Sequence, residues 1–572
     1  MVQEITITTP RHNNQVIDIG DGFIMRWSTA ADTENIADLV GDAFRYSSFS
    51  ATPEGEIPGP FEPLMCCVRR LLSGNSLAMS EYDYAMVENT RAAAGENPIV
   101  ACAALHEIPS FYGSVKMIFG KPEQIACASA YRNRGLVRRL MFDMIHPESE
   151  RRGHLIQYMP GIDYFYRLFG YEFALSSPDG SELSNLDDNI PKLNEGEQER
   201  YILRPATVAD IPYLVKLSAD KRCLFTHKTE VGSIYDHRYW HYFVHGIYQP
   251  PHISWYDQSR VVTILHDTLE KRDIGFNQHV YMNGLGWQKF ALEHGIAMRN
   301  VIYPVLRQMV ALAQDQAKAC HAYEMNKKKN KAKKDDENTK QKKEQEEEKE
   351  KEEEEEKAPE ISSIALELPL EHPALEFLSS KFDPRPDVPD AMLYARINDY
   401  SAFLTKVSPA LEERLARSPH FAGISATLRL HFFRKVEGMN ASGLEIVFEN
   451  GLFVHARPWK KPTREQEGAE KQAKAKAAAA AAAAAQKEKD DGEGENKEKQ
   501  QEQPSTATTT AATTVFGAQF YPLVFSQLLL GCKSVRELIW SNIDNQTDDN
   551  ESRLFLETLF PKVEHDIDLL IW

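Results

Sequence analysis

Residues 125–171 read IACASAYRNRGLVRRLMFDMIHPESERRGHLIQYMPGIDYFYRLFGY, and this stretch decides the fold. Its apolar start at 125–128 predicts a strand. Residues 136–145 carry apolar side chains at helical spacing and predict a helix. Residues 154–159 predict a further strand, which leads into an aromatic turn. A strand, a turn, a helix and a strand in this order are typical of an α/β layer.

The turn between the first strand and the helix is basic and contains one glycine. Its sequence is Arg132-Asn133-Arg134-Gly135. A small residue lets the backbone approach a pyrophosphate, and the free amides and dipole of a helix's first turn attract it. The arginines, together with Arg138, add positive charge. The pattern predicts a phosphate-binding turn; the alternative is a basic helix start on a solvated face.

The whole chain has 572 residues, a net charge of −18 and a pI of about 5.5. Its length predicts about three domains. The acidity argues against a nucleic-acid binder, which needs a basic field, and allows a cationic partner. The seven cysteines form no CxxC pair, so we expect neither disulfides nor a metal site. Without a signal-peptide layout or a membrane-length apolar run, we expect a cytoplasmic protein with no membrane partner.

Two segments of the chain share one order of elements. From residue 23 to residue 174 the predicted order is β-α-α-β-β-β-α-β-α-β, which indicates helices packed on a mixed sheet. Residues 201–210 repeat the strand and helix start of residues 25–32, so we expect a duplicated fold. The later helix near residue 300 has no glycine in its turn, which predicts that the second copy lacks the phosphate turn. We predict domains at 1–196 and 197–388.

Two further segments have the composition of insertions. Residues 326–358 form a Lys/Glu block without an apolar face, which predicts a solvated helix or a disordered insertion. Residues 460–514 carry a run of nine alanines. Positive and negative charges nearly cancel within each of these two segments. The net negative charge of the chain therefore belongs to the remaining residues. Residues 389–572 otherwise predict a third α+β domain, and its apolar end at 568–572 predicts a docked C-terminus.

Two short motifs carry a family resemblance. The segment RNRGL at 132–136 is similar to motif A of the GNAT acetyltransferases, whose turn holds the pyrophosphate of acetyl-CoA. Together with YRLFGY at 166–171, it resembles the Eis (enhanced intracellular survival) type. Val137 departs from the small residue usual in the motif, and Arg167 from the glycine that follows the tyrosine. The resemblance implies an α/β (α+β) fold with two tandem GNAT-like mixed-sheet domains and a sterol-carrier-protein-2-like (SCP2-like) C-terminal domain.

The resemblance also implies an activity. It implies an acetyl-CoA-dependent N-acetyltransferase acting on primary amines of a polyamine, an aminoglycoside-like molecule or lysine. It implies that Tyr166 is the catalytic acid and that the carboxylate of Trp572 is a base or an orienting group. Bacterial members form hexamers, so a homo-oligomer is expected. The implied cofactor-binding residues are Ile125, Ala126, Cys127, Arg132, Asn133, Arg134, Gly135, Leu136 and Val137.

Other residues and another function class compete with this interpretation. His146 and His154 are alternative bases, although their positions at element boundaries favour structural roles. Core packing is the expected role of Tyr164 and Tyr171. Phe44 and Tyr46 are candidates for the lining of an acceptor pocket. The alternative function is a non-catalytic ligand-binding or scaffold protein with a vestigial CoA site.

Overall fold

The computed structural model describes most of the chain as three mixed sheets with helices, which confirms the α/β fold class. The described residues form two compact units, one within 1–398, 526–533 and 562–572, the other within 399–525 and 534–561. Within them, no helix is long and apolar enough to cross a bilayer. The described residues are 16–45, 59–74, 79–80, 82–177, 181–226, 228–245, 260–281, 284–336, 360–369, 372–381, 391–433, 442–463, 466, 472 and 513–567.

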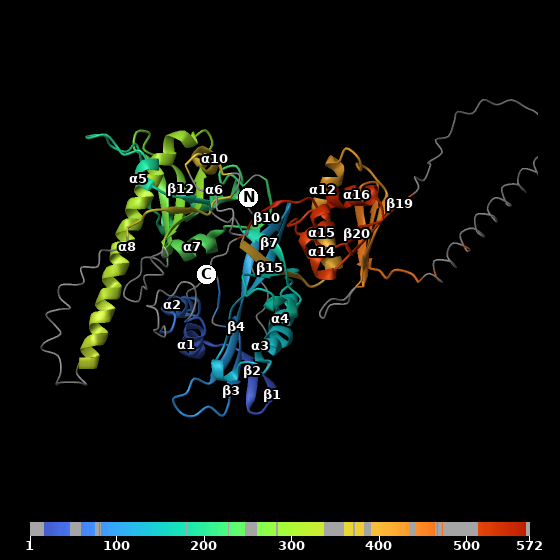
Figure 1. Cartoon of the computed structure of the whole chain (residues 1–572), viewed down its shortest axis with the longest axis horizontal. Helices are drawn as coiled ribbons and strands as arrows, with labels where there is room; N and C mark the ends of the chain where they lie inside the picture. The colour runs from blue at the N-terminus through green and yellow to red at the C-terminus, as the bar shows by residue number, and fades with distance from the viewer. Residues whose placement is uncertain are drawn as a thin grey trace, which may run out of the picture. The chain divides into compact units, whose positions relative to one another are not determined.

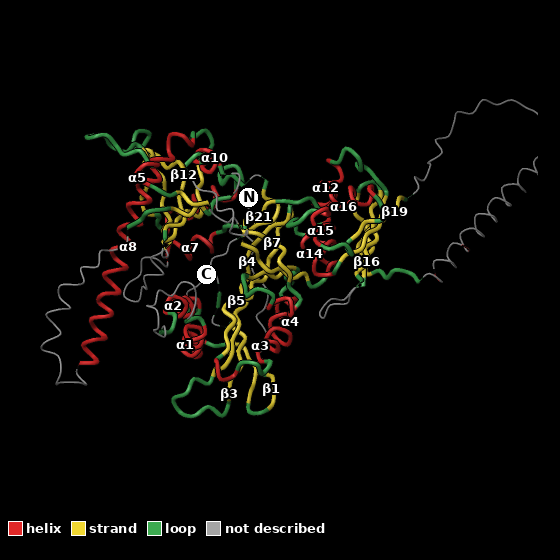
Figure 2. Tube along the Cα trace, in the orientation of Figure 1, coloured by secondary structure: helices red, strands yellow, loops and turns green. Residues whose placement is uncertain are grey.

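The ten-stranded sheet of the first unit carries the basic turn. The helices α1 (Thr33–Ala43) and α2 (Glu62–Leu71) lie on one side of this sheet. The helix after the turn lies on the other side and runs through α3 (Leu136–Arg139), a π-helical turn (Leu140–Ile145) and α4 (His146–Arg151). Figures 1 and 2 show this arrangement of helices about the sheet. The strands, in spatial order, are β1 (Ile17–Gly20), β2 (Phe23–Trp27), β3 (Tyr84–Asn89), β4 (Ile99–Tyr112), β5 (Val115–Cys127), β6 (Ile156–Met159), β15 (Ala391–Ile397) and β7 (Glu172–Ser177), with β10 (Thr229–Ser233) on β4 and β21 (Glu564–Asp566) on β10.

The parallel strands β5 and β6 separate soon after they meet. In the described residues a single register pair, Gly120 with Gln157, joins them. In contrast, β5 pairs with β4 along almost its whole length. The last residues of β5 therefore have one paired edge and one open edge, and the open edge ends at the basic turn.

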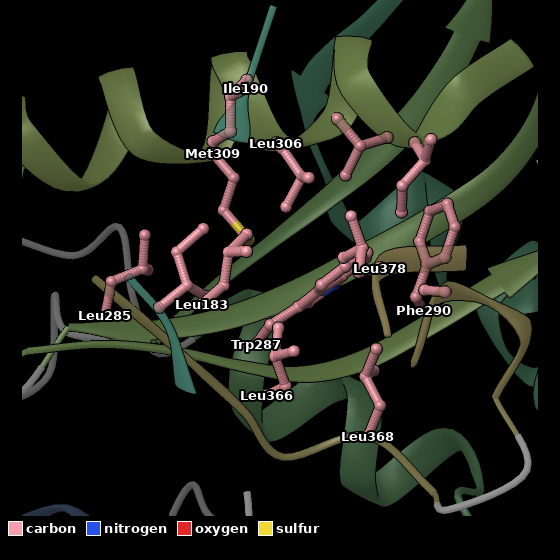
Figure 3. Close-up of a cluster of buried hydrophobic side chains, with 14 of the residues drawn as sticks. Leu183, Ile190, Leu285, Trp287, Phe290, Leu306, Met309, Leu366, Leu368 and Leu378 are labelled. Carbon is pink, nitrogen blue, oxygen red and sulfur yellow. The ribbon is translucent and has the colours of Figure 1, made fainter. Parts of the chain in front are cut away.

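The six-stranded sheet is covered by a long helix. Figure 3 shows that Leu306 and Met309 of α8 (Met298–Asp336) pack over Trp287 and Phe290, all of them buried. The helix extends to Asp336, inside the charged block predicted at 326–358; residues 337–359 lie outside the described residues. The strands, in spatial order, are β8 (Ser181–Leu183), β14 (Ile364–Leu366), β13 (Leu285–Leu292), β12 (Arg272–Tyr281), β11 (Arg260–Asp267) and β9 (Tyr201–Pro205), and the other helices are α5 (Leu186–Asn189), α6 (Ile211–Ala219), α7 (His237–His245) and α10 (Pro373–Leu378).

The two predicted copies of the fold, at 1–196 and 197–388, are called the first and second half below. Both begin with the same arrangement of side chains. Arg26 forms a two-pronged contact with Asp32 at 2.9 and 2.8 Å. Arg204 contacts Asp210 in the same way, at 2.9 and 2.7 Å. Each carboxylate also accepts hydrogen bonds from a threonine three residues earlier. The repeated geometry supports the duplication that the sequence predicts.

Sheet membership crosses both predicted domain boundaries. Strand β8 precedes residue 196 but pairs with β14 in the six-stranded sheet. Strand β15 follows residue 388 but lies between β6 and β7 in the ten-stranded sheet. Both are short strands whose partners lie far away in sequence, so local patterns do not reveal which sheet they join.

The second unit contains a five-stranded mixed sheet with an aromatic core. Phe516 stacks on Phe555 with ring centroids 4.3 Å apart, and Phe421 contacts both rings edge-on. The segment predicted as an insertion at 460–514 lies between β18 and β19 and is almost entirely outside the described residues. The strands, in spatial order, are β18 (Leu452–Pro458), β17 (Gly443–Glu449), β16 (Ala426–Phe432), β19 (Thr514–Phe520) and β20 (Gln546–Thr547), and the helices are α11 (Tyr400–Lys406), α12 (Ser408–Arg417), α14 (Pro522–Leu529), which continues into the first unit, α15 (Val535–Ser541) and α16 (Asn550–Leu559).

Candidate active site

The open edge of β5 presents backbone amides. The N–H of Ala128 donates to the carbonyl of Val100 on β4 at 2.9 Å. Because backbone groups alternate along a strand, the N–H groups of Ile125 and Cys127 point toward the open edge. Ala126 has the opposite orientation and faces Cys102 of β4, so its backbone is not available there. The open edge can therefore pair with an extended amide-containing ligand such as a pantetheine arm.

The turn that follows has the backbone conformation that an anion site needs. Asn133 and Gly135 both adopt left-handed conformations, with φ of 62° and 75°. Nothing lies within 4 Å of the position that a Cβ on Gly135 would take. The first helical turn begins at Leu136, and its side chain is buried in the core while its amide has no intrahelical acceptor. The amides of Leu136, Val137 and Arg138 are thus suited to bind a pyrophosphate.

The arginines of the turn are exposed, and their contacts include backbone carbonyls and aromatic rings. The Nε of Arg132 donates to the carbonyl of Cys127 at 3.3 Å. The guanidinium of Arg134 lies 5.0 Å from the ring centre of Tyr131. Arg138 lies over Phe142 at 4.8 Å. The contacts of Arg132 and Arg134 are with uncharged groups and do not neutralise their positive charge.

Tyr166 lies in the aromatic segment that follows β6. It belongs to a short 3₁₀ helix (Phe165–Phe169), and its ring contacts the ring of Tyr394 at 5.6 Å. Tyr166 is part of the buried cluster against which Ile125 and Cys127 also pack. The proposed acid and the open edge of β5 therefore border the same cluster of side chains.

The environment of Tyr166 keeps its hydroxyl protonated. Burial raises the pKa of Tyr166 to about 12. No described residue hydrogen-bonds to its hydroxyl. A Cβ on Gly161 would lie 2.4 Å from two atoms of the ring, so this glycine permits the close packing of the chain on Tyr166. The phenol is fixed by ring contacts while its hydroxyl stays available to a ligand.

The competing histidines and tyrosines have other partners. His154 bonds to Ser149 at 3.0 Å and to Glu107 at 3.2 Å. His146 contacts the Tyr171 hydroxyl at 3.1 Å, and burial lowers the pKa of His146 to about 2. Both histidines are bound within the core, which favours structural roles. Tyr171 is buried as expected, but core packing was wrong for Tyr164, which is 74% exposed.

The last described strand, β21, belongs to the ten-stranded sheet. β21 pairs with β10, and the following Ile567 is 3% exposed. The Nε2 of His565 donates to the carbonyl of Leu530 at 2.8 Å, and its Nδ1 accepts the backbone N–H of Ser176 at 3.1 Å. Trp572 lies outside the described residues, as does Tyr46, so their predicted roles stay predictions. Phe44 is half-buried at the end of α1.

A buried polar cluster on β4 and β5 escaped the sequence analysis. Lys121 is 0% exposed and its Nζ lies 3.1 Å from Glu123. His106 is paired in register with Lys121, and neither of its ring nitrogens has a hydrogen-bond partner among the described residues. Burial and Lys121 lower the pKa of His106 to about 3. Two charged residues at alternate positions of an otherwise apolar strand were the signal that could have revealed this cluster.

The second half closes the edge that the first half leaves open. The N–H of Glu293 bonds to Ile274 of β12, as the N–H of Ala128 bonds to β4. Leu292 therefore corresponds to Cys127, but its N–H donates to the carbonyl of Cys223 at 3.1 Å. Gly295 alone adopts a left-handed conformation before α8. The predicted loss of the phosphate turn thus accompanies a strand edge that the chain itself fills.

Comparisons with known proteins support the fold. No protein-family model and no curated protein matches the sequence. A GCN5-related N-acetyltransferase from Kribbella flavida has a TM-score of 0.51 and 11% identity over 96% of this chain and 98% of that chain. A GCN5-related N-acetyltransferase from Anabaena variabilis has a TM-score of 0.51 and 11% identity over 95% of this chain and 99% of that chain. A probable N-acyltransferase from Enterococcus faecalis has a TM-score of 0.50 and 11% identity over 96% of this chain and 100% of that chain. The chain therefore has the fold of these N-acetyltransferases along nearly its whole length.

Proposed function

We propose that the chain transfers an acetyl group from acetyl-CoA to the primary amine of a cationic small molecule or a lysine side chain. The observation that carries this proposal is the open edge of β5, which ends at a turn with two left-handed residues and a helix start. An extended pantetheine arm and a pyrophosphate match these two features in sequence. The motif resemblance to the Eis type supports the same donor.

The open edge also suits the chemistry of the thioester. When the amine attacks, the new C–N bond forms and negative charge develops on the carbonyl oxygen. A backbone N–H aimed at that oxygen stabilises the charge, and removing one such donor typically costs about 10²–10³ in rate. The N–H groups of Ile125 and Cys127 are the candidates, because they face the open edge.

The departing sulfur needs a proton as the C–S bond breaks, and Tyr166 is the proposed donor. With a pKa of about 12, its phenol is a weaker acid than a thiol of pKa about 8.5. Full transfer to the sulfur would be uphill by about 5 kcal/mol. We infer that Tyr166 relays a proton: it donates to the departing sulfur while it accepts one from the attacking nitrogen. No phenolate accumulates in this scheme.

The acceptor is expected to be a cation. A net charge of −17 belongs to the chain outside the two insertions, since 326–358 carries −1 and 460–514 carries 0 of the total of −18. The carboxylate of Trp572, which the family resemblance assigns to the site, would orient an ammonium or accept its proton. A homo-oligomer is proposed on the family resemblance alone.

The test is acetyl-CoA-dependent thiol release with a panel of polyamines, aminoglycosides and lysine peptides. We expect turnover by the full chain, and a loss of kcat in Tyr166→Phe and in a chain that lacks Trp572. Tyr164→Phe is the matched control, because Tyr164 is an exposed neighbour. Binding of acetyl-CoA without turnover of any amine would favour the non-catalytic alternative, and a full chain that does not bind acetyl-CoA would exclude the enzyme.

A further inference from the structure

Three side chains converge beside the closed strand edge of the second half. The Nε2 of His294 lies 2.7 Å from the Oδ2 of Asp220 and 3.7 Å from the Sγ of Cys223. The ligand atoms of the three residues all lie within 4.8 Å of one another. Cys223 is buried, Asp220 is half-buried and His294 is exposed, so one side of the group faces solvent.

We propose that Asp220, Cys223 and His294 bind a divalent metal ion of the zinc type. Zinc takes sulfur at about 2.3 Å and nitrogen and oxygen at about 2.0–2.2 Å. Tetrahedral geometry then separates nitrogen from sulfur by about 3.6 Å and nitrogen from oxygen by about 3.3 Å. The observed 3.7 Å is close to the first value, and the 2.7 Å contact needs to lengthen by about 0.6 Å. A water molecule completes the four ligands on the open side.

The geometry argues against the other reading of these residues. In a nucleophilic triad, the thiol and the carboxylate contact opposite nitrogens of the imidazole. Here both contact the same nitrogen of His294. The three ligand atoms lie within 4.8 Å of one another, and a mixed oxygen, nitrogen and sulfur set suits zinc among the abundant divalent ions.

The backbone builds this site where the first half holds its open edge. The N–H of Cys223 bonds to the carbonyl of Asp220 at 2.9 Å and closes a turn. The carbonyl of Cys223 in turn accepts the N–H of Leu292, two residues before His294. These two backbone hydrogen bonds bring together Cys223 and His294, which are 71 positions apart in the sequence. The second half thus has the proposed metal site where the first half has an open strand edge. The ligands lie too far apart in the sequence for cysteine spacing to have predicted it.

The test uses the full chain, stripped with a chelator and titrated with Co²⁺ and then Zn²⁺. We expect about one equivalent bound at this site, with a thiolate-to-cobalt absorption band in the near ultraviolet. Cys223→Ser should abolish the band, and His294→Ala should weaken Zn²⁺ binding at least tenfold. His294 is exposed, so the His294→Ala chain is expected to fold.

Two matched controls keep the readout specific. His266 contacts Asp273 at 2.8 Å without a thiol, so His266→Ala should leave metal binding unchanged. Cys66 is a thiol outside this cluster, so Cys66→Ser should leave metal binding unchanged. The proposal fails if the chain binds no metal, or if Cys223→Ser and His294→Ala bind it as tightly as the wild type. Neither result depends on acyl transfer.

Discussion

Gly120 and Gln157 form the single register pair between β5 and β6 within the described residues. A Cβ on Gly120 would lie 2.7 Å from the Oγ of Ser149 and 2.8 Å from the Nδ1 of His154. Close packing at this point holds the two strands together where they meet. Beyond it they separate, and the open edge of β5 results.

Gly135→Ala should weaken acetyl-CoA binding with a modest loss of stability. The left-handed backbone at Gly135 costs an alanine about 1–2 kcal/mol, while the added methyl meets no neighbour. Isothermal titration with acetyl-CoA and thermal unfolding measure the two effects. Gly196→Ala is the matched control, since Gly196 has a φ of 83° and an equally empty surrounding. Equal effects on binding in both variants would contradict the role of the turn.

Tyr166→Phe should lower kcat by about 10²–10⁴ and leave the KM for acetyl-CoA nearly unchanged, because it removes a proton relay and no ring contact. Since burial raises the pKa of Tyr166 to about 12, its hydroxyl stays protonated below that pH. The pH–rate profile of the wild type should therefore show no tyrosine titration between about pH 6 and 10. A profile whose limb near pH 10 disappears in Tyr166→Phe would refute this assignment.

Gly161→Ala should lower kcat, as Tyr166→Phe does, while acetyl-CoA still binds. The new methyl would lie 2.4 Å from the Tyr166 ring and has to displace it. Such overpacking typically costs about 1–3 kcal/mol of stability. Steady-state kinetics and thermal unfolding measure both effects. Gly59→Ala serves as the control, because a Cβ there meets nothing within 4 Å. Normal turnover by Gly161→Ala would mean that the position of Tyr166 does not matter.

Asp210→Asn should remove an acid-sensitive part of the stability. The hydrogen bond from Arg204 is the largest cause that holds the pKa of Asp210 at about 2. A carboxylate with a depressed pKa stabilises the fold above its unfolded value of about 3.9 and loses that contribution as the pH falls to about 2. After allowance for solvent screening, we expect about 1 kcal/mol.

Denaturant unfolding at pH 7 and at several values between pH 4 and 2 measures this contribution. The wild type should lose it over that interval, and Asp210→Asn should lack it throughout. Asp187→Asn is the control, since the Asp187 and Lys192 side chains are 81% and 78% exposed. An identical pH dependence in wild type and Asp210→Asn would refute the contribution.

Local patterns predicted the parts of the site that are continuous in sequence. The strand that ends at Cys127, the turn at Gly135 and the following helix occur as the residues 125–145 indicated. Turn chemistry and apolar spacing determine such elements, because their conformations depend on near neighbours. Tyr166 lies in the buried cluster against which Ile125 and Cys127 pack, and its catalytic role stays a prediction.

Features that depend on distant partners were not predictable. The apolar pattern of β15 predicts a strand, but nothing local in it selects β6 and β7 as neighbours. The same holds for the bond between Cys223 and Leu292, which closes the second strand edge. Tyr164 was assigned to the core on composition, but its left-handed backbone, with a φ of 64°, accompanies an exposed ring.

The insertion of β15 between β6 and β7 has a consequence for biosynthesis. A ribosome that adds about 5–20 residues per second needs roughly 10–40 s to reach β15 after β7 has been made. During that interval the facing edges of β6 and β7 lack their partner strand, and unpaired edges favour aggregation. The sheet that bears the basic turn is completed only after β21 has also been released from the ribosome. Nascent chains of this protein should therefore depend on ribosome-associated chaperones.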